Sequence, residues 1–204
     1  EHREQLYLEA TQIEQLVVHI TPRFQPLVYS AVYLGCRWGE LVGLKQENLN
    51  LLKREVRIVG TLEEVQGGPR YVDETKTRAS RRTLTVPPFL RDILEQHLKA
   101  TRPKTFVFLG EDGGLMRRSN FNRRYWKPAV SAAGLPGALR FHDLRHTCAS
   151  ILISQGAHPK EIQARLGHSS IMTTMDRYGH LFPSLGKQLD ENLEEVFQRA
   201  RRSA

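Results

Sequence analysis

Apolar residues recur at helical spacing along most of the chain. Ile13, Leu16, Val17 and Ile20 occupy positions i, i+3, i+4 and i+7, which predicts an amphipathic first helix. The run PLVYSAVYL predicts a second helix that stops near Gly35, and GELVGL predicts a short helix soon afterwards. We therefore expect helices to make up most of the structure.

Capping residues predict where several helices begin and end. Thr11 followed by Glu14 has the spacing of a capping box at the first helix. A long helix is expected after the two prolines at 87–88, and Ser119 is expected to cap another helix that ends at Gly134. The remainder of the chain is also expected to be helical, interrupted at glycines and prolines.

One β-rich segment interrupts the helical pattern. REVRIVG, RYVDE and RRTLTV predict strands of one small antiparallel sheet, with Lys76 in the polar turn between the last two. Leu84 and Val86 alternate with threonines, which predicts one buried and one exposed face. TFVFLG is a further candidate strand. The predicted fold class is α+β, mainly α with a small antiparallel β-sheet, in a single domain spanning residues 1–204.

Positive charge is concentrated in two segments of the chain. The 204 residues carry a formal net charge of +8, and cations cluster in RYVDETKTRASRR and RRSNFNRRYWK. Patches of this kind suit a polyanion such as nucleic acid, although solvated helix and hairpin surfaces also produce them. The candidate DNA-binding residues are Arg78, Arg81, Arg82, Arg117, Arg118, Arg123 and Arg124.

Neither a membrane nor an exported protein is indicated. No apolar run approaches the roughly 20 residues that span a bilayer, and the first residues lack the pattern of a secretory signal. Cys36 and Cys148 form no CxxC pair and lie in apolar runs, so we expect two buried free thiols and a reducing compartment. The expected location is therefore the cytoplasm.

Several residues have the chemistry needed to break a nucleic-acid backbone. Phosphodiester transfer needs fixed cations at the phosphate oxygens, an in-line nucleophile and a proton donor for the leaving oxygen. Arg37, Arg145, Lys76, His142 and His168 can supply charge and protons, and Tyr178 can supply the nucleophile. Nearby cations are expected to favour ionisation of this phenol. Taken singly, each of these residues has a more ordinary structural interpretation.

The order of these motifs resembles the tyrosine recombinases, the phage integrase family. The matching segments are LGCRWGELVGL, TKTRASRRTLTV, FHDLRHTCAS, LGHSS and MDRYGHL, and together they span nearly the whole chain. The resemblance implies the catalytic-domain fold of that family and site-specific DNA recombination through a covalent 3′-phosphotyrosyl intermediate.

The resemblance also implies a role for each matched residue. Arg37 and Arg145 would hold the scissile phosphate, and Lys76 would protonate the departing 5′ oxygen. His142 would assist proton transfer and His168 would hydrogen-bond a phosphate oxygen. Tyr178 would form the bond to DNA. Glu40 would support the site from behind the first arginine.

Partners and assembly are further expectations from the resemblance. We expect a double-stranded recombination site as substrate, no cofactor and no catalytic metal. The chain is interpreted as the C-terminal catalytic part of a longer recombinase that assembles as a homotetramer on DNA, whereas this part alone is expected to be monomeric. An amphipathic helix at 184–202 is expected to pack either on its own domain or on a neighbouring protomer.

Three alternatives remain open at this level. A type IB topoisomerase would use the same phosphotyrosine chemistry to relax DNA. The segment QGAHPKEIQARLGHSSIMTTMDRY has the texture of a helix-turn-helix, which would suit a noncatalytic regulator. His142 and His146 have i, i+4 spacing that suits zinc, but no third ligand is evident.

Overall fold

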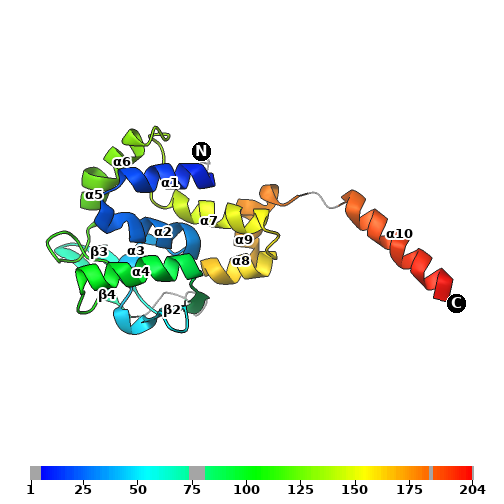
Figure 1. The fold of residues 1–204 in the computed structure, drawn as a ribbon, viewed down its shortest axis with the longest axis horizontal. Helices are drawn as coiled ribbons and strands as arrows, with labels where there is room; N and C mark the ends of the chain where they lie inside the picture. The colour runs from blue at the N-terminus through cyan, green and yellow to red at the C-terminus, as the bar shows by residue number, and fades with distance from the viewer. Residues whose placement is uncertain (1–5, 74–80, 184–185, 204) are drawn as a thin grey trace.

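The computed structural model describes residues 6–73, 81–183 and 186–203, and helices dominate it (Figure 1). The mainly α fold class with small antiparallel sheets is confirmed. The helices are α1 Ala10–His19, α2 Gln25–Leu34, α3 Trp38–Val42, α4 Pro88–Thr101, α5 Arg118–Phe121, α6 Lys127–Ala132, α7 Asp143–Ser154, α8 Pro159–Leu166, α9 Ile171–Tyr178 and α10 Gly186–Ser203. Shorter turns are the 3₁₀ helices η1 Pro22–Phe24, η2 Gln46–Asn48 and η5 Gly179–Leu181, and the π-helix η4 Asn122–Trp126.

Helix α2 lies at the centre of the body and contacts α1, α3, α4 and α7. Its sequence is apolar on nearly every side, and this suits a helix that is covered on several faces. Burial of large side chains such as Leu27, Leu34 and Leu144 provides the main hydrophobic stabilisation. Because α2 and α7 pack together, the C-terminal end of α2 is held close to the first turn of α7.

The strands form two antiparallel sheets, so the prediction of a single sheet was wrong. Strands β1 (Leu49–Asn50), β2 (Glu55–Ile58) and β5 (Arg82–Thr85) form one sheet in that order. Strands β3 (Thr61–Val65) and β4 (Gly68–Val72) form a separate hairpin. The RYVDE segment therefore pairs with β3 and not with RRTLTV.

The register explains why this pairing was missed. In the hairpin Leu62 pairs with Tyr71, and the turn uses Gly67 and Gly68, whose φ angles are +100° and +136°. The β3 sequence TLEEV carries two glutamates, so its polarity obscured the strand pattern. In the other sheet Val56 pairs with Leu84, and the predicted burial of Leu84 and Val86 is confirmed.

Several predicted boundaries differ from the structure. Helix α1 begins at Ala10, where the amide of Glu9 donates to Oε1 of Gln12, so the cap lies two residues before the predicted Thr11. Ser119 does not cap its helix, because α5 begins at Arg118 and continues into the π-helix. TFVFLG contributes an isolated bridge between Lys45 and Phe106 and does not form a strand.

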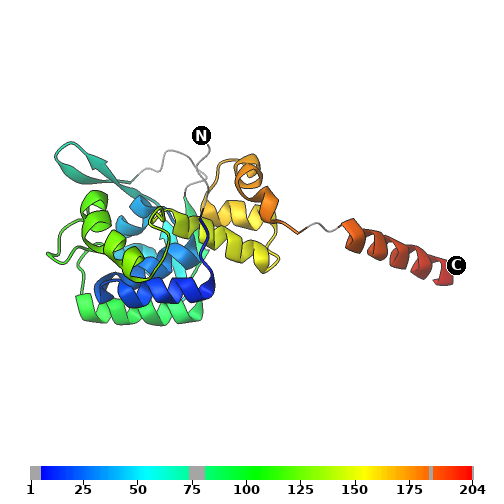
Figure 2. The same cartoon turned by 90° about the horizontal axis from the view of Figure 1, so that it is seen from above.

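The C-terminal helix α10 stands apart from the body in two perpendicular views (Figures 1 and 2). Its apolar residues Leu193, Val196 and Phe197 are 67%, 64% and 53% exposed. The structure thus leaves the apolar side of an amphipathic helix uncovered. In the described ranges, no helix has the length and apolar character required to cross a membrane.

Candidate functional site

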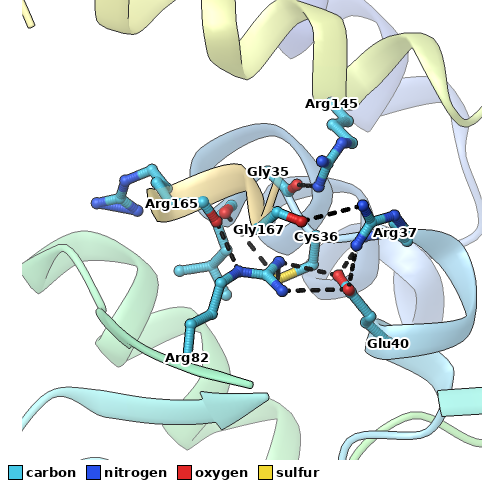
Figure 3. A network of polar contacts seen from close by, with 9 residues as sticks. Gly35, Cys36, Arg37, Glu40, Arg82, Arg145, Arg165 and Gly167 are labelled. Atoms are coloured by element: carbon cyan, nitrogen blue, oxygen red, sulfur yellow. Dashed lines mark hydrogen bonds and ion pairs between the residues drawn. The ribbon is translucent and has the colours of Figure 1, made fainter. Parts of the chain in front are cut away.

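Arginines from three separate segments converge on one site (Figure 3). Arg37 is the residue that precedes α3, Arg82 begins β5, and Arg145 lies in the first turn of α7. The ends of α2 and α8 approach the same place and supply backbone carbonyls. The fold thereby brings together residues that are more than one hundred positions apart in the sequence.

Two left-handed glycines direct those carbonyls at the arginines. Gly35 ends α2 with φ of +67°, and its carbonyl accepts a hydrogen bond from Nη1 of Arg145 at 2.7 Å. Gly167 ends α8 with φ of +66°, and its carbonyl accepts from Nη2 of Arg37 at 3.3 Å. The carbonyls at a helix C-terminus lack intrahelical partners and carry partial negative charge, so they suit guanidinium donors.

Glu40 connects two of the arginines from a buried position. Oε1 accepts from Nη1 of Arg37 at 2.8 Å, and Oε2 accepts from Nη2 of Arg82 at 2.9 Å. Burial alone would raise the pKa of Glu40, but the hydrogen bonds and charges of Arg82 and Arg37 outweigh it and lower the pKa to about 2. Glu40 is therefore ionised at neutral pH and orients both guanidinium groups.

Arg82 was predicted to be a surface cation that contacts DNA, but the structure places it differently. Its side chain is 7% exposed. Besides Glu40, it donates from Nε to the carbonyl of Arg165 at 2.7 Å and from Nη2 towards Sγ of Cys36 at 3.7 Å. The side chain of Arg82, at the start of β5, is therefore directed inward. It helps to hold Glu40, which in turn orients Arg37.

Arg145 differs from Arg82 because it retains an unused donor. The residue is 3% exposed, and its Nη2 is buried with no hydrogen-bond partner in the described part of the chain. Burial and then the neighbouring charge of Arg37 lower the pKa of Arg145 to about 10. A buried cation with a free donor beside a second cation is an unfavourable arrangement that a bound anion would relieve.

Tyr178 lies at the end of α9 and is fully buried. Its hydroxyl lies 2.8 Å from Nδ1 of His146, and its ring stacks on that of His168 with centroids 6.3 Å apart and planes inclined by 10°. His168 and Tyr178 therefore lie side by side, and both are close enough to Arg145 to be affected by its charge. Arg37 adjoins them through its contact with Gly167.

The expectation that nearby cations would acidify Tyr178 is not met in this DNA-free structure. Burial raises the pKa of the phenol to about 12, although the charges of Arg145 and Arg177 oppose the change. Desolvation is the larger effect here because the ring is fully enclosed. The nucleophile candidate is thus a neutral phenol.

The histidines of the site are also neutral at neutral pH. Burial, followed by the charges of His146 and Arg145, lowers the pKa of His142 to about 4. Burial, followed by Arg145 and Arg37, lowers the pKa of His168 to about 3. These imidazoles can therefore donate or accept hydrogen bonds, but they do not supply the positive charge that the sequence suggested. Nδ1 of His168 lies 2.9 Å from the hydroxyl of Thr174.

The other predicted cations divide into two groups. Lys76 and Arg78 lie outside the described residues. The exposed ones are Arg81, Arg117, Arg118, Arg123 and Arg124.

Trp126 lies in the same cationic segment, RRSNFNRRYWK, as four of these arginines. It is buried in the core and donates from Nε1 to the carbonyl of Leu139 at 3.0 Å, so it has a packing role.

Sequence reasoning missed the position of His146. This residue was considered only with His142 as a zinc pair, yet it contacts the Tyr178 hydroxyl. The available signal was its i, i+4 relation to His142, which puts the two histidines on the same side of the helix.

In the described ranges, no three His, Cys, Asp or Glu residues are grouped so that they could hold a metal ion. Cys36 and Cys148 are buried and free, as predicted.

Comparison with known families matches residues 7–184 to the family described as "Phage integrase family". A tyrosine recombinase XerC-like protein of Caldanaerobacter subterraneus subsp. tengcongensis is 30% identical over 86% of this chain and 50% of its own length. An integrase of Staphylococcus phage L54a is 26% identical over 93% of this chain and 60% of its own length. The chain thus spans between about half and three fifths of these relatives.

Solved structures share the fold. The Tn1549 transposon integrase in complex with transposon right end DNA has a TM-score of 0.82 at 21% identity, covering 96% of this chain and 67% of that one. The catalytic domain of bacteriophage HP1 integrase has a TM-score of 0.63 at 22% identity, covering 92% of this chain and 95% of that one. At these identities the likeness concerns the fold.

Proposed function

Because the chain belongs to the phage integrase family, we propose that it cleaves and rejoins DNA strands in site-specific recombination through a 3′-phosphotyrosyl intermediate. The family match covers residues 7–184, which include Arg37, Glu40, Arg145 and Tyr178. The proposed substrate is double-stranded DNA. The Tn1549 transposon integrase, which shares the fold, is complexed with transposon right end DNA in one solved structure and with circular intermediate DNA in another.

The unused donor of Arg145 is the observation that carries this proposal. Its Nη2 is buried and unpaired in the described chain, while Nη1 is fixed on the carbonyl of Gly35. Arg37 is also fixed through Glu40 and Gly167, yet its side chain remains 41% exposed. A phosphate placed between these guanidinium groups would satisfy the free donor and reduce the repulsion between the two like charges.

The proposed reaction uses the matched residues in distinct roles. Arg37 and Arg145 hold two nonbridging oxygens and stabilise the charge that develops in the transition state. Tyr178 attacks phosphorus in line, its Oη–P bond forms, and the P–O5′ bond breaks. Lys76 gives a proton to the departing 5′ oxygen, and His142 assists it. His168 donates to a phosphate oxygen and holds the tyrosine ring by stacking on it.

The exposed cations extend the proposed DNA contact. Arg81 directly precedes Arg82 in the sequence. The segment that leads into α5 and η4 provides Arg117, Arg118, Arg123 and Arg124. Phosphate contacts of this kind bind DNA in a strongly salt-dependent way without reading its sequence. We therefore propose that this chain alone binds DNA weakly and loses affinity as salt increases.

The proposed assembly is a homotetramer on DNA in the host cytoplasm. Helix α10 exposes Leu193, Val196 and Phe197, which an apolar groove on a neighbouring protomer would cover.

A noncatalytic helix-turn-helix regulator would have no use for the buried Arg145 donor. A type IB topoisomerase would use the same chemistry, so product analysis has to separate relaxation of one duplex from exchange between two.

A library of suicide substrates tests the proposal on many candidate sites at once. Nicked duplexes of randomised sequence are incubated with the chain, and covalent adducts are recovered under denaturing conditions and sequenced. The chain and its Tyr125→Phe variant should form adducts on an enriched sequence, whereas Tyr178→Phe should form none while retaining DNA binding. Adducts formed by Tyr178→Phe, or none formed by the unmodified chain, would contradict the proposal.

A further inference from the structure

The hydroxyl of Tyr178 already has a buried hydrogen-bond partner. Nδ1 of His146 lies 2.8 Å from it, and the two rings are 5.8 Å apart between centroids with planes inclined by 59°. His146 is 3% exposed and Tyr178 is fully buried. The contact joins α7 to the end of α9, so it links the helix that carries Arg145 to the residue that attacks DNA.

The other two histidines of the site are engaged differently. His168 covers the face of the tyrosine ring, and its Nδ1 lies against the hydroxyl of Thr174. His142 meets the ring of His146 edge to face, with centroids 5.2 Å apart. Of the three, His146 is the one that contacts the atom whose proton must leave when Tyr178 attacks phosphorus.

We propose that His146 is the general base that takes the phenolic proton of Tyr178 during strand cleavage and returns it during rejoining. This inference rests on the proposed function. As the Oη–P bond forms, the O–H bond of Tyr178 breaks and its proton moves to Nδ1, which makes an imidazolium. In the reverse step the 5′ hydroxyl attacks phosphorus and gives its proton back to the group that supplied it during cleavage. The P–Oη bond breaks, and the imidazolium returns its proton to the departing phenolate.

The charges around His146 suit a base that becomes effective when DNA binds. Burial lowers the pKa of His146 to about 4, Asp143 raises it, and Arg177, Arg140 and Arg145 lower it further. A phosphate bound at Arg145 would offset part of this positive field and favour the imidazolium. The groups that face the ring are Tyr178, His142, Asp143, Arg140, Arg145 and Arg177.

Replacement by asparagine separates proton transfer from positioning. The amide oxygen of His146→Asn can occupy roughly the place of Nδ1 and accept the phenolic hydrogen bond, but it cannot take up a proton. On the DNA sequence enriched by the library, single-turnover adduct formation by His146→Asn should fall by about 100-fold or more. DNA binding and thermal unfolding should change little. His19→Asn, at an exposed position on α1, is the matched control.

A modified substrate identifies which proton is affected. In a 5′-bridging phosphorothiolate the leaving group is a thiolate that departs without a proton donor. The defect of His146→Asn should therefore persist on this substrate, because the phenolic proton must still be removed. Recovery of the normal rate on the phosphorothiolate, or an oxygen-substrate rate within about threefold of the unmodified chain, would overturn the inference.

The unmodified protein provides a measurement that needs no DNA. Nitrogen NMR of the chain with isotope-labelled histidine should show that Nδ1 of His146 carries no proton and that the ring proton is on Nε2. This tautomer is required because the phenol must donate to Nδ1. A protonated Nδ1 would overturn the inference. Adduct formation by the unmodified chain alongside normal rates for His146→Asn would refute the role of His146 while leaving the recombinase function intact. The absence of any adduct would refute both.

Discussion

Nη2 of Arg82 lies 2.9 Å from Oε2 of Glu40, and their side chains are 7% and 3% exposed. Removing one partner of such a buried pair leaves an uncompensated charge, so Glu40→Ala should lower the free energy of unfolding by about 3–5 kcal/mol. Urea denaturation measures the change. The control is Glu95→Ala, whose ion pairs with Arg91 and Lys99 are exposed and screened by water, so it should change the free energy of unfolding far less than Glu40→Ala does.

The same carboxylate predicts how stability depends on pH. The pKa of Glu40 is lowered from its ordinary value of 4.5 to about 2 in the folded protein. As the pH falls, the unfolded chain therefore takes up this proton before the folded protein does. The stabilisation that ionised Glu40 provides is complete above pH 4.5 and is lost as the pH falls towards about 2. Denaturation series across this range should show the loss in the unmodified chain. The Glu40→Gln variant should lack this component.

Gly35 should tolerate a side chain poorly for two separable reasons. Its φ is +67°, and an added Cβ would lie 2.6 Å from Cδ2 of Leu166 and 3.0 Å from Sγ of Cys148. Gly134 has a similar φ of +65°, but its Cβ would meet nothing within 4 Å. Gly134→Ala should therefore cost about 1 kcal/mol from backbone strain alone. Gly35→Ala should cost clearly more in denaturation and also slow adduct formation, because its carbonyl positions Arg145.

Replacement by methionine should destabilise the fold at Arg82 much more than at Arg145. Arg82 donates to Glu40 and to the carbonyl of Arg165, so Arg82→Met should destabilise the fold by about 3 kcal/mol or more. Arg145 has a free buried donor, so Arg145→Met should change the free energy of unfolding by about 1 kcal/mol or less. Its adduct rate should nevertheless fall at least about 100-fold. Equal destabilisation by both variants would contradict the assignment of Arg145 to ligand binding.

The helical elements were predictable because their apolar spacing is regular and their ends carry glycine or proline. Gly35 ended the second helix as expected, since its left-handed φ terminates the hydrogen-bonding pattern. The hairpin was missed because Glu63 and Glu64 interrupt the apolar alternation of β3. Strand pairing depends on contacts between distant segments, which local patterns do not specify.

The candidate site was predictable as a set of residues but not as a geometry. The order of the motifs was enough to select Arg37, Arg145 and Tyr178 as candidates, because each is recognised by its neighbours in the sequence. The inward direction of Arg82 depends on β5 pairing with β2 and on Glu40 being buried opposite it. The contact of His146 with Tyr178 likewise depends on how α7 and α9 pack, and the ionisation of both groups follows from that burial.

Identification of the DNA-linked amino acid tests the central claim most directly. Trapped adduct is digested with nuclease and trypsin, and the modified peptide is sequenced by mass spectrometry. Cleavage after Arg177 and Lys187 should release YGHLFPSLGK with the nucleotide on Tyr178. A nucleotide on any other residue, or recovery of this peptide only in unmodified form, would contradict the account.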